Sequence, residues 1–266
     1  MKKAIVFDNS GTLVKRYRAI KHVSTGKIFT DINSMDIIDQ NDSLALVVLQ
    51  FNTNKLVNLA DDTLISDVIK KYNIDFDVSF TNKNLNVTKK EIRNVIVNDK
   101  KATVCDITDV FPILKEKIPN FELCNGSALI VDVDKAAIEY TITSAGVLFP
   151  NVLYTIDELK SRGIEIFIAS GDRKGAIDKL ADILGTDRNK AYGSVSPSGK
   201  SRVVSNLQDE GYNVMMVGDG INDILAFNQA NVSVLTTEQA SEVSSKMYNT
   251  TDYIIDEISK LLLIDF

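Results

Sequence analysis

Acidic residues follow two short apolar segments of the chain, in positions where they could hold a metal ion or attack phosphorus. Asp8 comes directly after the apolar run Ala4–Phe7 and opens a Gly-containing turn. The segment Gly218–Asp223, GDGIND, follows the apolar run Val214–Val217 and brings two carboxylates and an amide into one tight turn. Such a cluster is costly unless a cation neutralises it, and its oxygen ligands suit Mg²⁺, which binds through one or two carboxylates plus phosphate. An ordinary Gly/Asp turn is the alternative interpretation.

Two further segments offer groups that could bind a phosphoryl group. Ser170, in the turn Ser170–Asp172, could supply a hydroxyl and backbone N–H donors at the start of a helix. Lys200, directly after Pro197–Gly199, could supply an ammonium group. Each is weak evidence alone, since most such polar side chains are only solvated. Their combination with Asp8 and GDGIND, in the order nucleophile, hydroxyl, ammonium and metal-binding acids, indicates phosphoryl transfer.

Strands and helices alternate from Gly146 onward, which predicts a doubly wound α/β core. The predicted helices are Tyr154–Ser161, Lys174–Leu184, Lys200–Leu207 and Asp223–Gln229, and the predicted strands are Ile164–Ala169, Val214–Val217 and, as the last one, Val232–Leu235. With Ala4–Phe7 as the first strand, we expect a parallel sheet with helices on both faces. The carboxyl ends of parallel strands share one edge, so Asp8, Ser170 and the GDGIND turn should converge there with Lys200.

The segment between the first strand and Gly146 has a different pattern. Two hairpins are indicated, around Ser24–Gly26 and around Asp134-Lys135, with a strand at Ser43–Gln50 and helix-like stretches at Thr63–Tyr72 and Lys89–Val97. We therefore predict that residues 1–15 and 146–266 form the α/β core domain, and that residues 16–145 form an inserted α+β domain.

The composition is that of a soluble globular protein: the 266 residues are 44% apolar and 25% charged, with a net charge of −6. This acidity argues against a nucleic-acid-binding protein, whose phosphate contacts need a basic surface. The first apolar run is too short for a signal peptide, and no stretch reaches the ~18–20 apolar residues that span a bilayer. Cys105 and Cys124 have no CxxC spacing, which argues against a zinc site. We expect a cytoplasmic protein that binds neither nucleic acid nor membrane.

The four segments together resemble those of the haloacid dehalogenase superfamily, and within it the phosphorylation domain of P-type ATPases. Asp8–Leu13, DNSGTL, is similar to the motif D-K-T-G-T-L, Ser170–Asp172 to T-G-D, and Pro197–Lys200 to P-x-x-K. Val217–Asp223 matches V-G-D-G-I-N-D at every position. The resemblance covers residues 1–14 and about 146–250, and the insert stands where these ATPases carry their nucleotide-binding domain.

The resemblance implies a role for each residue. Asp8 would attack phosphorus and form an aspartyl-phosphate that water then hydrolyses. Mg²⁺ would be bound by Asp8, the backbone carbonyl of Ser10, Asp219 and Asp223. Lys200 and Ser170 would stabilise the phosphoryl oxygens, and the phosphate would also contact Ser10, Gly11, Thr12, Gly171 and Asn222. Asn222 and Asp223 would in addition order their loop, and the insert would be a cap that closes over the substrate.

Two departures from the motif bear on the activity. Asn9 replaces the usual Lys, and Ser10 stands where most phosphatases of the superfamily carry a second Asp as general acid and base. We expect a Mg²⁺-dependent phosphatase that acts on a phosphorylated small molecule; a nucleotide is one candidate, although the insert has no recognisable nucleotide fingerprint. The alternatives are a soluble ATPase that autophosphorylates at Asp8, and a non-catalytic module that responds to phosphate or metal.

The Ser at position 10 predicts a preference among substrates. Its hydroxyl cannot protonate a departing alkoxide at neutral pH as a carboxyl can, and such acid–base catalysis is typically worth ~10²–10⁴ in rate. Acyl phosphates, anhydrides and aryl phosphates should therefore react faster than sugar and other alkyl phosphates. The measurement is phosphate release from a series of substrates of graded leaving-group pKa. A rate that is independent of that pKa would mean that another residue donates the proton.

Overall fold

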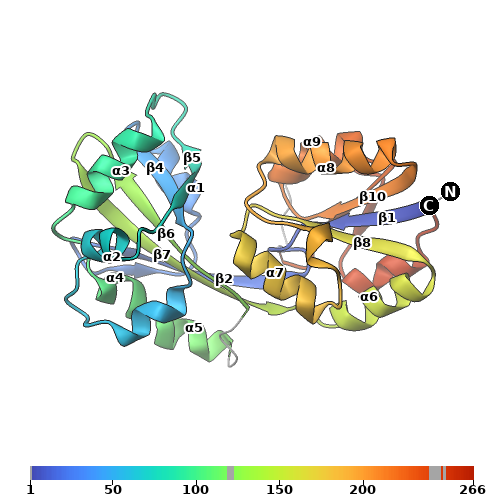
Figure 1. Cartoon of the computed structure of the whole chain (residues 1–266), viewed down its shortest axis with the longest axis horizontal. Coiled ribbons are helices and arrows are strands. Elements are labelled where there is room, and N and C mark those ends of the chain that lie inside the picture. Colours follow the sequence, from blue (N-terminus) through green and yellow to red (C-terminus); the bar gives the residue numbers. More distant parts are fainter. Residues whose placement is uncertain (1, 119–122, 240–246, 248–249) are drawn as a thin grey trace. The chain divides into compact units, whose positions relative to one another are not determined.

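The computed structural model describes residues 2–118, 123–239, 247 and 250–266, which belong to two compact units (Figure 1). The core unit consists of Met1–Arg16 and Gly146–Phe266, and the second unit, which we name the cap unit after its predicted role, consists of Tyr17–Ala145. Each unit is built on its own six-stranded β-sheet.

The core unit contains a sheet of six strands in the order β12-β11-β10-β1-β8-β9. All neighbouring strands in it are parallel. In chain order the strands are β1 (Lys2–Phe7), β8 (Ile164–Ala169), β9 (Ala191–Tyr192), β10 (Tyr212–Gly218), β11 (Val232–Thr236) and β12 (Tyr253–Ile255). The expected α/β class and parallel sheet are therefore confirmed.

Helices cover both faces of this sheet, with α8 and α9 on one side and α6 and α7 on the other (Figure 1). Their bounds are α6 (Val152–Ser161), α7 (Lys174–Ile183), α8 (Pro197–Asp209) and α9 (Ile224–Gln229). Alternate residues of the central strands, such as Val6 and Met216, pack against Val204 and Leu207 of α8 and Phe227 of α9. Within the part of the chain that is described, no helix combines the length and the apolar character needed to cross a bilayer.

Three features of the core unit differ from the sequence-based expectation. Val232–Leu235 is not the last strand, because β12 pairs with it in parallel register. The helix expected from Asp223 begins one residue later, since Ile221–Asp223 forms a 3-10 turn, η3. The helix that carries Lys200 begins at Pro197, because the Ser196 side chain accepts a hydrogen bond from the Gly199 N–H and caps it.

The cap unit has a second six-stranded sheet, in the order β3-β2-β7-β6-β4-β5, and it is a mixed α and β structure as expected. β4 is antiparallel to both β5 and β6. The elements in chain order are β2 (Val14–His22), β3 (Ile28–Phe29), α1 (Ser34–Asp39), β4 (Leu44–Leu49), η1 (Thr53–Asn58), α2 (Ile65–Lys71), β5 (Phe76–Thr81), α3 (Lys89–Asn98), α4 (Val104–Thr108), α5 (Phe111–Lys117), β6 (Leu123–Asp132) and β7 (Ala137–Leu148).

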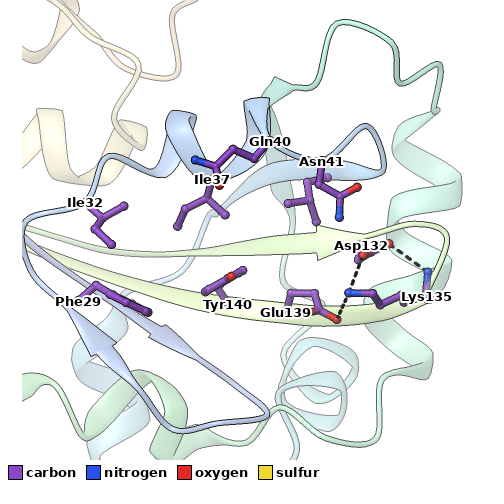
Figure 2. A pocket seen from close by; sticks show the side chains of 10 residues that line it. Phe29, Ile32, Ile37, Gln40, Asn41, Asp132, Lys135, Glu139 and Tyr140 are labelled. Atoms are coloured by element: carbon purple, nitrogen blue, oxygen red, sulfur yellow. Dashed lines mark hydrogen bonds and ion pairs between the residues drawn. The ribbon is translucent and has the colours of Figure 1, made fainter.

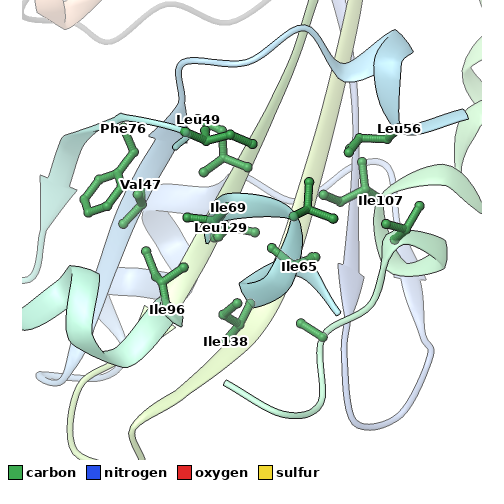
Figure 3. Close-up of a cluster of buried hydrophobic side chains, with 14 of the residues drawn as sticks. Val47, Leu49, Leu56, Ile65, Ile69, Phe76, Ile96, Ile107, Leu129 and Ile138 are labelled. Carbon is green, nitrogen blue, oxygen red and sulfur yellow. The ribbon is translucent and has the colours of Figure 1, made fainter. Parts of the chain in front are cut away.

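Most of the hydrophobic core of the cap unit lies on one face of its sheet (Figure 3). Alternate residues of β4, such as Val47 and Leu49, pack there against α2, α3 and α4 through side chains such as Ile69, Ile96 and Ile107. This core belongs entirely to the cap unit, just as the packing of α8 and α9 belongs entirely to the core unit. Each sheet is therefore stabilised by helices of its own unit.

The other face of the cap sheet is covered less completely, by the short helix α1. A cavity of about 390 Å³ lies between this helix and the sheet (Figure 2). Apolar and aromatic side chains such as Phe29, Ile37 and Tyr140 form much of its wall, and Lys135 pairs with Asp132 and Glu139 at one end. None of the residues that line it belongs to the site predicted from the sequence.

Candidate active site

The strands of the core sheet bring three predicted segments to one edge. Phe7, the last residue of β1, lies beside Val217 of β10 and Ile168 of β8. The residues that follow these strands, including Asp8, Ser170 and Asp219, therefore leave the sheet at neighbouring points. The convergence that parallel strands require is thus present in the structure.

Lys200 connects the first and last of these segments. Its Nζ lies 2.7 Å from Asp8 Oδ1 and 2.7 Å from Asp223 Oδ1. All three residues are buried, with Asp8 3% exposed and Lys200 1% exposed. The first turn of α8 carries Lys200, and the turn after β10 carries Asp223. One ammonium group therefore ties two loops of the sheet edge together.

Asp223 uses both of its carboxylate oxygens. Oδ1 accepts from Lys200, and Oδ2 accepts hydrogen bonds from the backbone N–H groups of Asp219 and Gly220, each at 3.2 Å. These bonds close the GDGIND turn on itself. The geometry therefore agrees with a loop-ordering role for Asp223, while its role as a metal ligand stays a prediction.

Asp8, Asp219 and Asp223 form a compact carboxylate cluster, in which one oxygen of each lies within 4.8 Å of the others. Gly11 makes room for Asp219: it has a φ of +88°, and a Cβ atom there would lie 1.9 Å from Asp219 Oδ2. Only glycine satisfies both the backbone conformation and this close approach. The DNSGTL turn and the GDGIND turn are thus fitted to each other.

The cluster carries more negative charge than Lys200 can balance. Burial disfavours the charged form of Lys200, but the carboxylates of Asp8 and Asp223 outweigh this effect and raise the pKa of Lys200. Burial and the Asp8 carboxylate raise the pKa of Asp223 to about 6. Burial, Asp8 and Asp223 likewise raise the pKa of Asp219 well above its ordinary value. A bound cation would relieve this repulsion, so the donor set could hold a metal ion.

A second polar cluster surrounds Asp172. Its Oδ2 accepts hydrogen bonds from Asn9 Nδ2 at 2.7 Å, Ser10 Oγ at 2.8 Å and Ser170 Oγ at 3.1 Å. Its Oδ1 lies 2.6 Å from Nη2 of Arg16, which also donates to Ser10 Oγ. Burial opposes ionisation of Asp172, but Arg16 and the three donors outweigh it and lower the pKa of Asp172. Asp172 is therefore a carboxylate at neutral pH.

The remaining predicted residues occupy different surroundings. Thr12 is fully buried, and its Oγ1 has no hydrogen-bond partner among the residues that the structure describes. Gly171 and Asn222 are exposed, on the turn after β8 and on η3. A Cβ atom on Gly171 would make only ordinary contact with Val195 O, at 3.7 Å, so space alone does not require glycine there.

Arg16 is the residue that the sequence analysis did not identify. It was assigned to the inserted domain, whereas it belongs to the core unit and contacts Ser10 and Asp172. The turn after β1 is closed on itself, with the Gly11 N–H donating to Val14 O at 2.8 Å, and this compact loop keeps a basic residue just beyond it close to the site. The basic residues Lys15, Arg16 and Arg18 were a visible signal, but the pattern does not say which of them returns.

A parallel α/β core with acidic and basic side chains buried at the carboxyl edge of its sheet is typical of enzymes that bind an anion there. A family model for haloacid dehalogenase-like hydrolases matches residues 2–231. The chain belongs to this family and is therefore a hydrolase.

Two relatives illustrate the similarity in sequence. A soluble P-type ATPase-like phosphatase of Methanocaldococcus jannaschii is 37% identical over 263 residues, which are 98% of this chain and 92% of that protein. The copper-transporting ATPase PAA2 of Arabidopsis thaliana is 28% identical over 170 residues, which are 60% of this chain but 19% of the transporter. The match to the transporter thus concerns a small part of its length.

Among solved structures, the chain is similar to a catalytic domain of the CPx-ATPase CopB-B and to a phosphoserine phosphatase. The CopB-B domain is 18% identical, with a TM-score of 0.47 over 98% of this chain and 87% of the other. The phosphoserine phosphatase, in a phospho-aspartyl intermediate analogue form, is 17% identical, with a TM-score of 0.44 over the full length of both chains.

The close approach of Gly11 to Asp219 can be tested by adding a single methyl group. Gly11→Ala should weaken Mg²⁺ binding strongly, because the new Cβ displaces the Asp219 carboxylate. The matched control is Gly26→Ala, which also introduces Ala at a positive φ, +68°, but meets nothing within 4 Å. Both variants should lose about 1–2 kcal/mol of stability through backbone strain. Calorimetric titration with Mg²⁺ makes the comparison, and a Gly11→Ala protein that binds Mg²⁺ like Gly26→Ala would show that the close approach does not matter.

Proposed function

We propose that the chain is a Mg²⁺-dependent phosphatase in which Asp8 is the nucleophile and forms an aspartyl-phosphate intermediate. The observation that carries the proposal is the buried Asp8 carboxylate at the end of β1, paired with Lys200 and grouped with Asp219 and Asp223. The name of the M. jannaschii relative, a soluble P-type ATPase-like phosphatase, supports the same reaction class. A carboxylate nucleophile divides a difficult displacement at phosphorus into two easier ones.

The residues present fit Mg²⁺. Asp8 and Asp219 offer carboxylate oxygens, the backbone carbonyl of Ser10 is close in sequence to Asp8, and Asp223 completes the acidic cluster. The raised pKa values of Asp219 and Asp223 support a site built for a positive charge. When bound, the ion would screen the repulsion between the Asp8 carboxylate and an anionic phosphate.

In the first step, an oxygen of Asp8 forms a bond to phosphorus while the bond between phosphorus and the leaving-group oxygen breaks. The leaving group departs with that electron pair. Lys200, which already donates to Asp8 Oδ1, would orient the nucleophile and stabilise the charge on the phosphoryl oxygens. Burial of Asp8 and Lys200 strengthens these interactions, because less water competes for them.

In the second step, water attacks the same phosphorus and the bond to Asp8 breaks, which returns the Asp8 carboxylate and releases inorganic phosphate, while the protons of the water stay on the phosphate or pass to solvent. Ser10 has no carboxyl group to accept the proton from this water, so we expect slow decay of the phosphoenzyme. The same absence underlies the expected preference for good leaving groups in the first step.

Donors for the phosphoryl oxygens would come from several loops. Ser10, Gly11 and Thr12 follow the nucleophile, Ser170 and Gly171 follow β8, and Asn222 lies on η3. The Thr12 hydroxyl lacks a hydrogen-bond partner among the described residues, which supports a role for it as a donor to a phosphoryl oxygen. We assign the cap unit to substrate recognition, with a phosphorylated small molecule as the substrate. We include in the proposal that this unit closes over the site when substrate binds.

Two substitutions test the roles of the carboxylates. Asp8→Asn should abolish turnover, since the nearly isosteric amide is not a nucleophile, and should leave the unfolding transition cooperative. Asp219→Asn should retain turnover only at a much higher Mg²⁺ concentration. The measurement is release of phosphate from an aryl phosphate as a function of Mg²⁺. Retention of a tenth of the wild-type rate by Asp8→Asn would refute the nucleophile, and an unchanged Mg²⁺ dependence in Asp219→Asn would remove that residue from the metal site.

Two further measurements separate the alternatives. Incorporation of label from γ-labelled ATP without release of phosphate would favour an autophosphorylating ATPase. Phosphate or Mg²⁺ binding without any turnover over a panel of substrates would favour a binding module.

A further inference from the structure

Two hydrogen bonds fix the backbone of Arg16, whose side chain contacts the polar cluster around Asp172. Arg16 is the last residue of the first core segment, and the next residue, Tyr17, belongs to the cap unit. The Arg16 N–H donates to Gln239 Oε1 at 2.8 Å, and Gln239 Nε2 donates back to the Arg16 carbonyl at 3.3 Å. Two backbone hydrogen bonds from one side-chain amide therefore hold this residue at the core unit.

The guanidinium group of Arg16 donates to Asp172, the carboxylate that also accepts the hydrogen bonds of the other side chains in the cluster. Asp172 accepts hydrogen bonds from Asn9, Ser10 and Ser170 on one oxygen and from Arg16 on the other. A hydroxyl group has a single proton to donate. In this arrangement the protons of Ser10 and Ser170 are therefore both directed to Asp172, and neither is directed to a ligand.

An anion that binds beside these serines would meet hydroxyl oxygens and a carboxylate. For Ser10 or Ser170 to donate to a phosphoryl oxygen, its hydroxyl proton has to turn away from Asp172. The Asp172 carboxylate then loses a donor while a second negative charge arrives nearby. Without a cation this rearrangement is doubly unfavourable, because it leaves a partly buried charge short of hydrogen bonds and adds repulsion.

We propose that Arg16 is a positioning residue whose guanidinium neutralises Asp172, so that the hydroxyls of Ser10 and Ser170 can be released to a phosphoryl group. The proposal rests on the function proposed above, since it assigns the site to a phosphoryl ligand. Arg16 suits this task because guanidinium is always charged and carries several N–H donors in a fixed plane. It can keep its bond to Asp172 Oδ1 while the hydroxyls on Oδ2 turn.

Arg16 could instead only hold the loops together, and a double substitution distinguishes the two roles. Arg16→Gln leaves the Asp172 charge without its cation, whereas Arg16→Gln combined with Asp172→Asn removes both charges. If neutralisation is what matters, the double variant binds an anion better than the single variant. If the pair is only a structural link, the double variant is no better.

The experiment is calorimetric titration of the full chain with inorganic phosphate in the presence of Mg²⁺. We expect Arg16→Gln to bind phosphate about 10- to 100-fold more weakly than the wild type, as loss of a charged hydrogen-bonding partner implies. The double variant should recover a large part of this loss, and Arg16→Lys, which keeps the charge, should stay within a few-fold of the wild type. The control is Arg202→Gln, which removes an exposed Arg from α8 two residues after Lys200 and should leave phosphate binding unchanged.

The proposal would be overturned if Arg16→Gln bound phosphate as tightly as the wild type does. It would also be overturned if the double variant bound phosphate no better than Arg16→Gln does. If Arg16→Gln does not fold, Arg16→Lys, which keeps the charge, decides between the two roles. A folded Arg16→Lys protein that loses as much phosphate affinity as a Ser10→Ala control would also overturn the proposal. Failure of the proposed function looks different, since a wild type that binds phosphate but turns over no phosphate ester would remove the phosphatase and leave the role of Arg16 measurable.

Discussion

The buried ion pairs of Lys200 are the interaction on which the rest of the site depends. Removing an ammonium group from water costs several kcal/mol, and the cost is recovered only through well-placed partners. Lys200 finds them in Asp8, at the end of β1, and in Asp223, in the turn after β10. Asp223 in turn accepts two backbone N–H groups of its own loop. The one ammonium thus fixes Asp8, the proposed nucleophile, together with this loop, and it leaves the Asp219 carboxylate unbalanced, which favours a bound cation.

Much of the core fold could be predicted because its central strands are buried on both faces. Continuous apolar runs such as Val214–Val217 have only one stable place, the middle of a parallel sheet covered by helices. The edge strands carry no such signal: β9 has two residues, and Tyr253 and Ile254 of β12 are exposed. The sequence-based prediction started α8 three residues late, at Lys200, where the helical spacing of apolar residues begins. The helix starts at Pro197 because the Ser196 side chain caps it and the first turn of a helix accepts proline.

The sequence indicated the charged groups of the site better than it indicated their partners. Asp8, Lys200 and Asp223 follow from strand ends and motif spacing, and they are in contact. The cluster around Asp172 was not predicted, because it depends on how the turn after β1 brings Arg16 back to Ser10. Hydrogen bonds between loops that are distant in sequence depend on exact backbone paths, which periodicity and residue type do not encode. Gly11 shows the same limit: its need for space arises only from the position of Asp219.

Transfer of the phosphoryl group to Asp8 can be observed directly. The wild-type protein, mixed with Mg²⁺ and a ³²P-labelled acyl phosphate, is quenched in acid during turnover, digested, and its labelled peptide identified by mass spectrometry. The account predicts label on the peptide that contains Asp8, stable in acid and released by hydroxylamine, as an acyl phosphate is. Label that resists hydroxylamine, or that maps to Ser10, Thr12 or Ser170, would contradict the assignment of Asp8 as the nucleophile.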